Sequence, residues 1–171
     1  DWSSDVCSSD LFLQHSSIQT DTRKLKEGDI FFALKGPSFN GNEFAKQALD
    51  SGATYAVVDE ATEPSDSRII KVNDALQTLQ QLAKYHRQQF DIPFIAITGS
   101  NGKTTTKELV HEVLNSTFTT YTTKGNLNNH IGIPLTILSV GMDAEMAVIE
   151  MGANHQKEIE SYCNYTLPTH G

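Results

Sequence analysis

The sequence predicts an α/β fold in two parts, a small amino-terminal α/β domain and the opening of a second domain with a parallel sheet. Three observations lead to this class. Short apolar runs alternate with segments of helical period along the chain, as in α/β proteins. Two of the runs, at 94–98 and 146–151, are almost wholly apolar, which is typical of strands covered on both faces of a parallel sheet. Between them, a glycine-rich turn at 99–102 opens a segment of helical period.

The first domain is predicted over residues 12–90. Its strands should be short runs rich in Ile, Phe and Val, and we expect them at 30–34, 55–58 and 69–72. Residues 35–42 contain two glycines and a proline and predict a loop. Apolar residues at helical spacing predict two helices, at 43–51 and 75–87. The first of these should end at Gly52.

The second domain is predicted over residues 91–171, with the boundary placed within a linker at 90–93. Its strands are expected at 94–98, 118–121 and 146–151. Its helices are expected at 103–115, at 131–138 and from 158 onward. Four apolar residues should share one face of the first helix: Leu109, Val110, Val113 and Leu114. Because the sequence stops at Gly171 soon after Pro168, without a terminal cap or tail, this domain is predicted to be truncated.

Composition and charge exclude several classes of protein. The 171 residues carry a net charge of −8 and are 38% hydrophobic, which disfavours a general affinity for nucleic acid or an anionic membrane. No apolar run approaches the roughly 20 residues that span a bilayer. The two cysteines, Cys7 and Cys163, are far apart and fit a reducing cytoplasm. Residues 1–11 are rich in Ser and Asp without a period, and we interpret them as a disordered or foreign leader.

The strongest motif is ITGSNGKTTT, which lies between a predicted strand and a predicted helix, as a phosphate loop (P-loop) does. Gly99 and Gly102 let the backbone turn so that N–H groups face phosphate oxygens, and the start of the helix favours negative charge. Lys103 supplies a positive charge for the β- and γ-phosphates, and the Thr104 hydroxyl suits Mg²⁺. The alternative is a glycine turn with a chance Lys-Thr pair, since Ile97 stands where the standard pattern has glycine.

A second motif, IEMGANH, places Glu150 at the end of the second apolar run. In open α/β sheets, ligands bind at the carboxyl ends of the strands. A carboxylate there can hold Mg²⁺ directly or through water. The alternative is a solvated charge at a strand end.

Two further segments carry weaker signals. GNLNNHIGIP, at 125–134, has three asparagines and a histidine that could bind a polar, hydroxylated substrate, although composition alone favours an ordinary Asn-rich turn. TDTR, at 20–23, together with FALKG, at 32–36, could bind a diphosphate through hydroxyl and basic groups. The alternative for this pair is a solvated turn.

Taken in this order, the segments resemble the Mur ligase family over residues 18–171. TGSNGKTT is shared with the wider superfamily, including folylpolyglutamate synthases, whereas GNLNN and EMGANHQ are more specific to the branch that adds D-alanyl-D-alanine. The resemblance implies three domains in a whole enzyme. This chain would hold the first, over 12–90, which binds the UDP-linked substrate, and the opening of the second, over 91–171, a P-loop-type ATPase domain with a parallel sheet.

The resemblance also implies an activity and its partners. ATP, with Mg²⁺, would activate the carboxylate of UDP-N-acetylmuramoyl-tripeptide as an acyl phosphate, which the amine of D-alanyl-D-alanine then attacks. The family enzymes imply a monomer in the cytoplasm, and the fragment alone is not expected to turn over. Another Mur or folylpolyglutamate-type ligase and a non-catalytic nucleotide-binding module are the alternatives. GNLNN and EMGANHQ argue against the first of these, and the dedicated amino-terminal domain argues against the second.

The site residues implied by the resemblance fall into four groups. Lys103 and Glu150 would be catalytic. Thr104 and Glu150 would serve Mg²⁺. The ATP-binding residues would be Gly99, Ser100, Asn101, Gly102, Lys103, Thr104 and Thr105. The substrate-binding residues would be Thr22, at the uridine diphosphate, and Asn126, Asn128, Asn129, Asn154 and His155.

Overall fold

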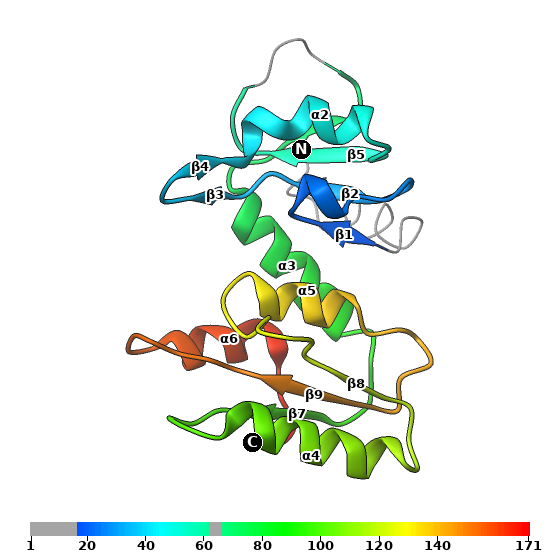
Figure 1. The fold of residues 1–171 in the computed structure, drawn as a ribbon, viewed down its shortest axis with the longest axis vertical. Helices are drawn as coiled ribbons and strands as arrows, with labels where there is room; N and C mark the ends of the chain where they lie inside the picture. The colour runs from blue at the N-terminus through cyan, green and yellow to red at the C-terminus, as the bar shows by residue number, and fades with distance from the viewer. Residues whose placement is uncertain (1–16, 62–65) are drawn as a thin grey trace. The chain divides into compact units, whose positions relative to one another are not determined.

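The computed structural model describes residues 17–61 and 66–171. The chain divides into two compact units, Asp1–Leu79 and Gln80–Gly171 (Figure 1), and the division falls within helix α3 (Ala75–Arg87). The predicted limits of the two domains remain predictions. The predicted leader, residues 1–11, lies outside the described residues. Within the described part of the chain, no helix combines the length and the apolar character needed to cross a bilayer.

A four-stranded parallel sheet forms the centre of the first unit, with strand order β1-β2-β5-β6. Its strands are β1 (Ile18–Gln19), β2 (Ile30–Phe32), β5 (Tyr55–Val58) and β6 (Ile69–Lys71). Every pair is parallel, so all four carboxyl ends lie at one edge. Three of these strands were predicted, whereas β1 has only two residues and is too short to show a period of two.

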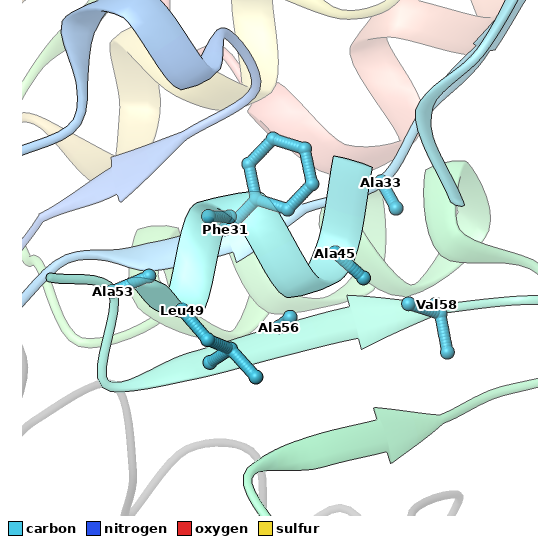
Figure 2. Packing of buried hydrophobic residues seen from close by; sticks show 8 residues of the cluster. Phe31, Ala33, Ala45, Leu49, Ala53, Ala56 and Val58 are labelled. Atoms are coloured by element: carbon cyan, nitrogen blue, oxygen red, sulfur yellow. The ribbon is translucent and has the colours of Figure 1, made fainter. Parts of the chain in front are cut away.

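The core of the first unit packs helix α2 (Ala45–Asp50) against one face of this sheet (Figure 2). Five of the eight buried residues in this cluster are alanines, and small side chains let the helix backbone approach the strands closely. The strands and the adjoining loop contribute Phe31, Ala33, Ala53, Ala56 and Val58, and the helix contributes Ala45, Ala48 and Leu49. The alternation of inward-facing residues along β2 and β5 is the period of two expected for strands.

The loop predicted at 35–42 is more ordered than expected. It forms a hairpin of β3 (Lys35–Gly36) and β4 (Phe39–Asn40), followed by the 3₁₀-helix η2 (Gly41–Phe44). The predicted helix 43–51 therefore begins as a 3₁₀ turn and becomes α-helical at Ala45. A side chain at Gly41 would clash with the backbone of Ala33 and Leu34, so this turn needs glycine.

The second unit contains a three-stranded parallel sheet of order β7-β9-β8. Its strands are β7 (Phe94–Ile97), β8 (Thr120–Thr122) and β9 (Met146–Glu150). Helix α4 (Lys103–Asn115) covers one face, and α5 (Gly132–Leu138) and α6 (Glu158–Thr166) cover the other (Figure 1). These helices match the predicted ones closely, since each has strong local period and a turn or loop on either side.

The two apolar runs of this sheet differ in burial. Four of the five residues of β9 are fully buried, as predicted for a central strand. In β7 only Phe94 is fully buried and the other three residues are half-buried. The reason is position, because β7 is an edge strand of the sheet that the structure describes, and the Ala96 N–H donates to the carbonyl of His170 at 2.9 Å on its outer side.

The apolar face predicted for α4 is wrong. Leu109 and Val113 are 64% and 71% exposed, and the fully buried residue of this helix is Lys107. Positions 103, 107, 110 and 114 follow the 3.6-residue period and face the sheet, so two of the four predicted apolar residues turn outward. Hydrophobicity alone could not identify this face, because its central residue is a lysine.

Arg87, the last residue of α3, forms hydrogen bonds with several backbone segments of the second unit. Its guanidinium donates to the carbonyls of Thr166 (3.0 Å), Phe90 (2.9 Å) and Leu167 (3.0 Å), and it lies 3.9 Å from the ring centroid of Phe94. The side chain is almost fully buried. Three charge-assisted hydrogen bonds in a buried place contribute strongly to stability.

We expect Arg87→Lys to lower the free energy of unfolding of the second unit by about 3 kcal/mol, because one ammonium cannot reach three separated carbonyls and leaves buried acceptors unpaired. Urea unfolding followed by circular dichroism measures this change. The matched control is Arg68→Lys, at an arginine whose side chain is 46% exposed and paired with Asp66. An Arg87→Lys midpoint equal to that of the control would contradict the assigned role.

Candidate active site

The glycine loop connects β7 to α4 in a conformation that needs its two glycines. Gly99 and Gly102 have φ values of 143° and 76°, in the region that residues with side chains rarely adopt. Gly102 directly precedes α4, and no side chain caps the helix at this described position. The first-turn N–H groups of α4 are therefore available to an anion, and the helix dipole favours one there.

Lys103 folds back over this loop, where its Nζ donates to the carbonyl of Gly99 at 2.7 Å. Within the described residues, no carboxylate pairs with it. Thr104 and Thr105 follow on the first turn and are exposed. At the carboxyl end of β7, the loop thus presents an ammonium without a described carboxylate partner, the exposed Thr104 and Thr105 and the amino terminus of a helix.

Glu150 lies at the end of β9, directly opposite Ile97, the last residue of β7. The Met151 N–H donates to the carbonyl of Ile97 at 2.8 Å, so the two strand ends are joined where the glycine loop begins. The carboxyl edge of this sheet therefore carries both the carboxylate and the loop, as open α/β sheets with ligand sites do.

The side chain of Glu150 is buried, with 1% exposure, so the alternative of a solvated charge at a strand end is wrong. Its Oε1 accepts a hydrogen bond from Asn128 Nδ2 at 2.7 Å. Its Oε2 is buried without a hydrogen-bond partner among the described residues. Burying a carboxylate oxygen without a hydrogen-bond partner costs free energy of folding. A bound cation would provide the missing partner.

Glu150 and Thr104 have the donor chemistry of a cation that is shared with phosphates. In the described part of the chain, no group of three or more His, Cys, Asp and Glu residues could enclose a metal ion by itself. Glu150 and the exposed hydroxyl of Thr104 are hard oxygen donors. Mg²⁺ usually takes one or two such protein ligands together with phosphate oxygens and water, so these residues fit Mg²⁺ bound to a nucleotide.

Thr123 and Lys107, which were not predicted as site residues, connect Glu150 to neighbouring elements through hydrogen bonds. Thr123 is fully buried, and its Oγ1 accepts the Glu150 N–H at 2.9 Å. Its carbonyl accepts a hydrogen bond from Lys107 Nζ at 2.8 Å. One available signal was that Lys107 lies one helical turn after Lys103 and therefore shares its face. Nothing in the sequence around Thr123 indicated its contact with Glu150.

The asparagine-rich loop lies against Glu150. The Asn128 side chain contacts its carboxylate, and the carbonyl of Asn128 accepts the Gly152 N–H at 2.7 Å. A methyl group at Gly152 would lie 3.0 Å from the Asn128 amide, so the glycine leaves room for it. Asn129 Oδ1 accepts the N–H groups of Ile131 and Gly132 and so turns the chain into α5. Asn126 is exposed on the same loop.

Asn154 and His155 are exposed in the loop that follows β9. Their backbone N–H groups donate to Glu158 Oε2 at 2.7 and 2.9 Å, which holds the loop against the start of α6. These two hydrogen bonds lower the pKa of Glu158, the bond from His155 most strongly. The lowered pKa favours the charged carboxylate, which accepts both backbone N–H groups.

Thr22 belongs to the first unit and is half-buried at the start of the 3₁₀-helix η1 (Thr22–Lys24). The adjoining Arg23, the basic group of the predicted diphosphate segment, pairs with Asp21 at 2.8 Å. Hydrogen bonds from Arg23 lower the pKa of Asp21 to about 2. The positive charge of Arg23 is therefore largely balanced by the carboxylate of Asp21.

Comparison with known families matches both units. A family model described as "Mur ligase family, catalytic domain" matches residues 14–87, and one described as "Mur ligase middle domain" matches residues 97–171. The second match begins at the end of β7 and includes both the glycine loop and Glu150.

Curated relatives carry the name UDP-N-acetylmuramoyl-tripeptide--D-alanyl-D-alanine ligase. The protein of Bacillus subtilis is 43% identical over 145 residues, which are 84% of this chain and 32% of the relative. The protein of Escherichia coli is 41% identical over 152 residues, which are 89% of this chain and 33% of the relative. The chain thus spans about a third of the length of the curated relatives it matches.

Solved structures agree with these matches. MurF from Acinetobacter baumannii superposes with a TM-score of 0.83 at 38% identity, covering 89% of this chain and 34% of that one. MurF ligase from Thermotoga maritima in complex with ADP gives 0.80 at 35% identity, covering 90% of this chain and 36% of that one. From its motifs, from the glycine loop beside Glu150 and from these matches, the chain belongs to the Mur ligase family.

Proposed function

We propose that this chain is part of an ATP-dependent ligase that joins D-alanyl-D-alanine to UDP-N-acetylmuramoyl-tripeptide in peptidoglycan synthesis. The observation that carries the proposal is the buried Glu150. It pairs with Ile97 at the strand end that leads into the glycine loop, and its Oε2 has no hydrogen-bond partner among the described residues. The names of the relatives and the branch-specific GNLNN and EMGANHQ segments support this acceptor. A monomeric state and a cytoplasmic location are part of the same proposal.

In the proposed reaction, a carboxylate oxygen of the tripeptide attacks the γ-phosphorus of ATP, and ADP leaves. The free amine of D-alanyl-D-alanine then attacks the acyl carbon, loses a proton and displaces inorganic phosphate, which leaves an amide bond. The first step brings two anions together. The Lys103 ammonium and the first-turn N–H groups of α4 would reduce this repulsion and stabilise charge that moves towards the leaving phosphate.

Glu150 and Thr104 would hold Mg²⁺, which supplies further positive charge at the phosphates when it is bound. Asn128 would orient the Glu150 carboxylate through its 2.7 Å hydrogen bond. Asn126, Asn129, Asn154 and His155 lie on the two loops that follow β8 and β9, at the same edge of the sheet. We assign them to the substrate side of the site, and Thr22 to the uridine diphosphate.

Calorimetric titration of the chain with UDP-N-acetylmuramoyl-tripeptide tests the substrate half of the proposal. We expect saturable binding that is tighter than binding of UMP and weaker by about tenfold in Thr22→Ala, since a hydrogen bond to a charged group contributes about 1.5 kcal/mol or more. The control is Thr117→Ala, an exposed threonine of the second unit.

Absence of binding by a folded chain that still binds Mg-ATP would contradict the proposed substrate and favour another member of the superfamily. Equal affinity for UMP and for the tripeptide would contradict recognition of the muramoyl-peptide portion. An affinity unchanged in Thr22→Ala would remove Thr22 from the substrate contact while leaving the substrate itself assigned.

A further inference from the structure

Lys107 is the fully buried residue of α4, with 1% exposure, on a helix whose Leu109 and Val113 point outward. Lysine is almost never fully buried unless its ammonium is paired. A leucine at this position would pack against the sheet without any electrostatic cost. The choice of lysine at the centre of the buried face therefore requires an explanation beyond packing.

The Lys107 ammonium has two described partners. Nζ donates to the carbonyl of Thr123 at 2.8 Å, and it forms an ion pair with Glu108, whose side chain is 55% exposed. The hydrogen bond from Lys107 lowers the pKa of Glu108. The ammonium is thus held between a surface carboxylate and the backbone just after β8, where it fixes the position of Thr123 relative to α4.

Thr123 connects Lys107 to Glu150 through hydrogen bonds. It is fully buried, and its N–H donates to the carbonyl of Val148 at 3.1 Å. Its hydroxyl accepts the Glu150 N–H at 2.9 Å. The Thr123 carbonyl therefore accepts from Lys107, and the Thr123 hydroxyl accepts from the backbone N–H of Glu150. These two hydrogen bonds link the backbone of Glu150, whose Oε2 has no partner among the described residues, to the helix that follows the glycine loop.

We propose that Lys107 and Thr123 are positioning residues for a divalent cation bound with a nucleoside triphosphate: they hold the backbone of Glu150 so that its unpartnered Oε2 is preset to ligate the ion. This inference rests on the proposed function, because it takes Glu150 as the cation ligand. Groups that orient a ligand without touching the metal commonly change metal affinity by about 10- to 100-fold. Lys103 and Lys107 then act on one site from one helix face, the first on the phosphates and the second through Thr123.

The test is the affinity of the chain for Mn²⁺ in the presence of a non-hydrolysable ATP analogue, with free Mn²⁺ measured by electron paramagnetic resonance. Thr123→Val keeps the shape of the side chain but removes the acceptor for the Glu150 N–H, and Thr123→Ser keeps the acceptor. We expect Thr123→Val and Lys107→Met each to weaken Mn²⁺ binding about tenfold or more. Thr123→Ser should bind like the unchanged chain, as should the control Lys124→Met at an exposed lysine.

Urea unfolding of the same variants separates positioning from packing. If Lys107→Met and Thr123→Val change the unfolding midpoint but bind Mn²⁺ as tightly as the unchanged chain, the two residues only pack the helix and the inference is overturned. Should Lys107→Met fail to fold, the Thr123→Val and Thr123→Ser pair decides. If the unchanged chain binds the nucleotide analogue without any Mn²⁺, the proposed function itself fails, and the inference with it.

Discussion

Replacing Lys103 with alanine is expected to lower the turnover of a full-length ligase carrying this sequence by on the order of 10²–10³-fold, the usual effect of losing one preorganised group that stabilises transition-state charge. Nζ already lies over the glycine loop, 2.7 Å from the Gly99 carbonyl, and no described carboxylate neutralises it. The loss should appear mainly in kcat, because the γ-phosphate gains charge interactions with the ammonium as it is transferred. Release of inorganic phosphate during D-alanyl-D-alanine addition measures it.

The matched control for Lys103→Ala is Lys124→Ala, which removes an exposed lysine from the loop after β8. Both variants change the net charge by the same amount, so a general effect of charge on the anionic substrates would appear equally in the two. Near-normal turnover in Lys103→Ala would refute its role at the phosphates. Equal losses of turnover in both variants would assign the effect to the overall electrostatic field of the protein rather than to the phosphate site.

Replacing Glu150 with glutamine should have two opposite effects. Gln keeps the shape and an oxygen that can accept from Asn128 Nδ2, but it removes the buried negative charge. Turnover of the full-length ligase should fall by on the order of 10²-fold, and half-maximal turnover should require more Mg²⁺, since a cation ligand has been neutralised. The chain without metal should become more stable by on the order of 1 kcal/mol, because an unpartnered buried charge is costlier than a neutral amide.

Glu112→Gln is the control for this second prediction, because Glu112 lies on the same unit and its side chain is 78% exposed. It should change neither the Mg²⁺ requirement nor the unfolding midpoint by a comparable amount. The midpoint is measured by urea unfolding in EDTA and the Mg²⁺ requirement by titration of turnover. If Glu150→Gln loses stability and keeps its Mg²⁺ dependence, Glu150 is a structural carboxylate and the cation must be held elsewhere.

Much of the secondary structure and of the nucleotide site followed from local sequence alone. The bounds of α3 and α4 were predicted to the residue or nearly so, because apolar period and flanking turn residues are properties of a short segment. The glycine loop was recognisable because positive φ angles at Gly99 and Gly102 demand glycine regardless of the surrounding fold. Glu150 could be placed at the strand end for the same local reason, since β9 is a continuous apolar run.

Contacts between distant segments bring together the groups at that strand end. The pairing of β7 with β9 sets Glu150 beside Ile97, and the rotation of α4 against the sheet buries Lys107 instead of Leu109. Thr123 contacts Glu150 only because β8 also pairs with β9. Burial of a charged side chain depends on contacts between segments far apart in the chain, and no local period encodes them. Local sequence therefore predicted most of the helices and strands and the phosphate loop. Strand pairing and helix rotation determined that Glu150 is buried, is held by Asn128 and Thr123 and has one oxygen without a described partner.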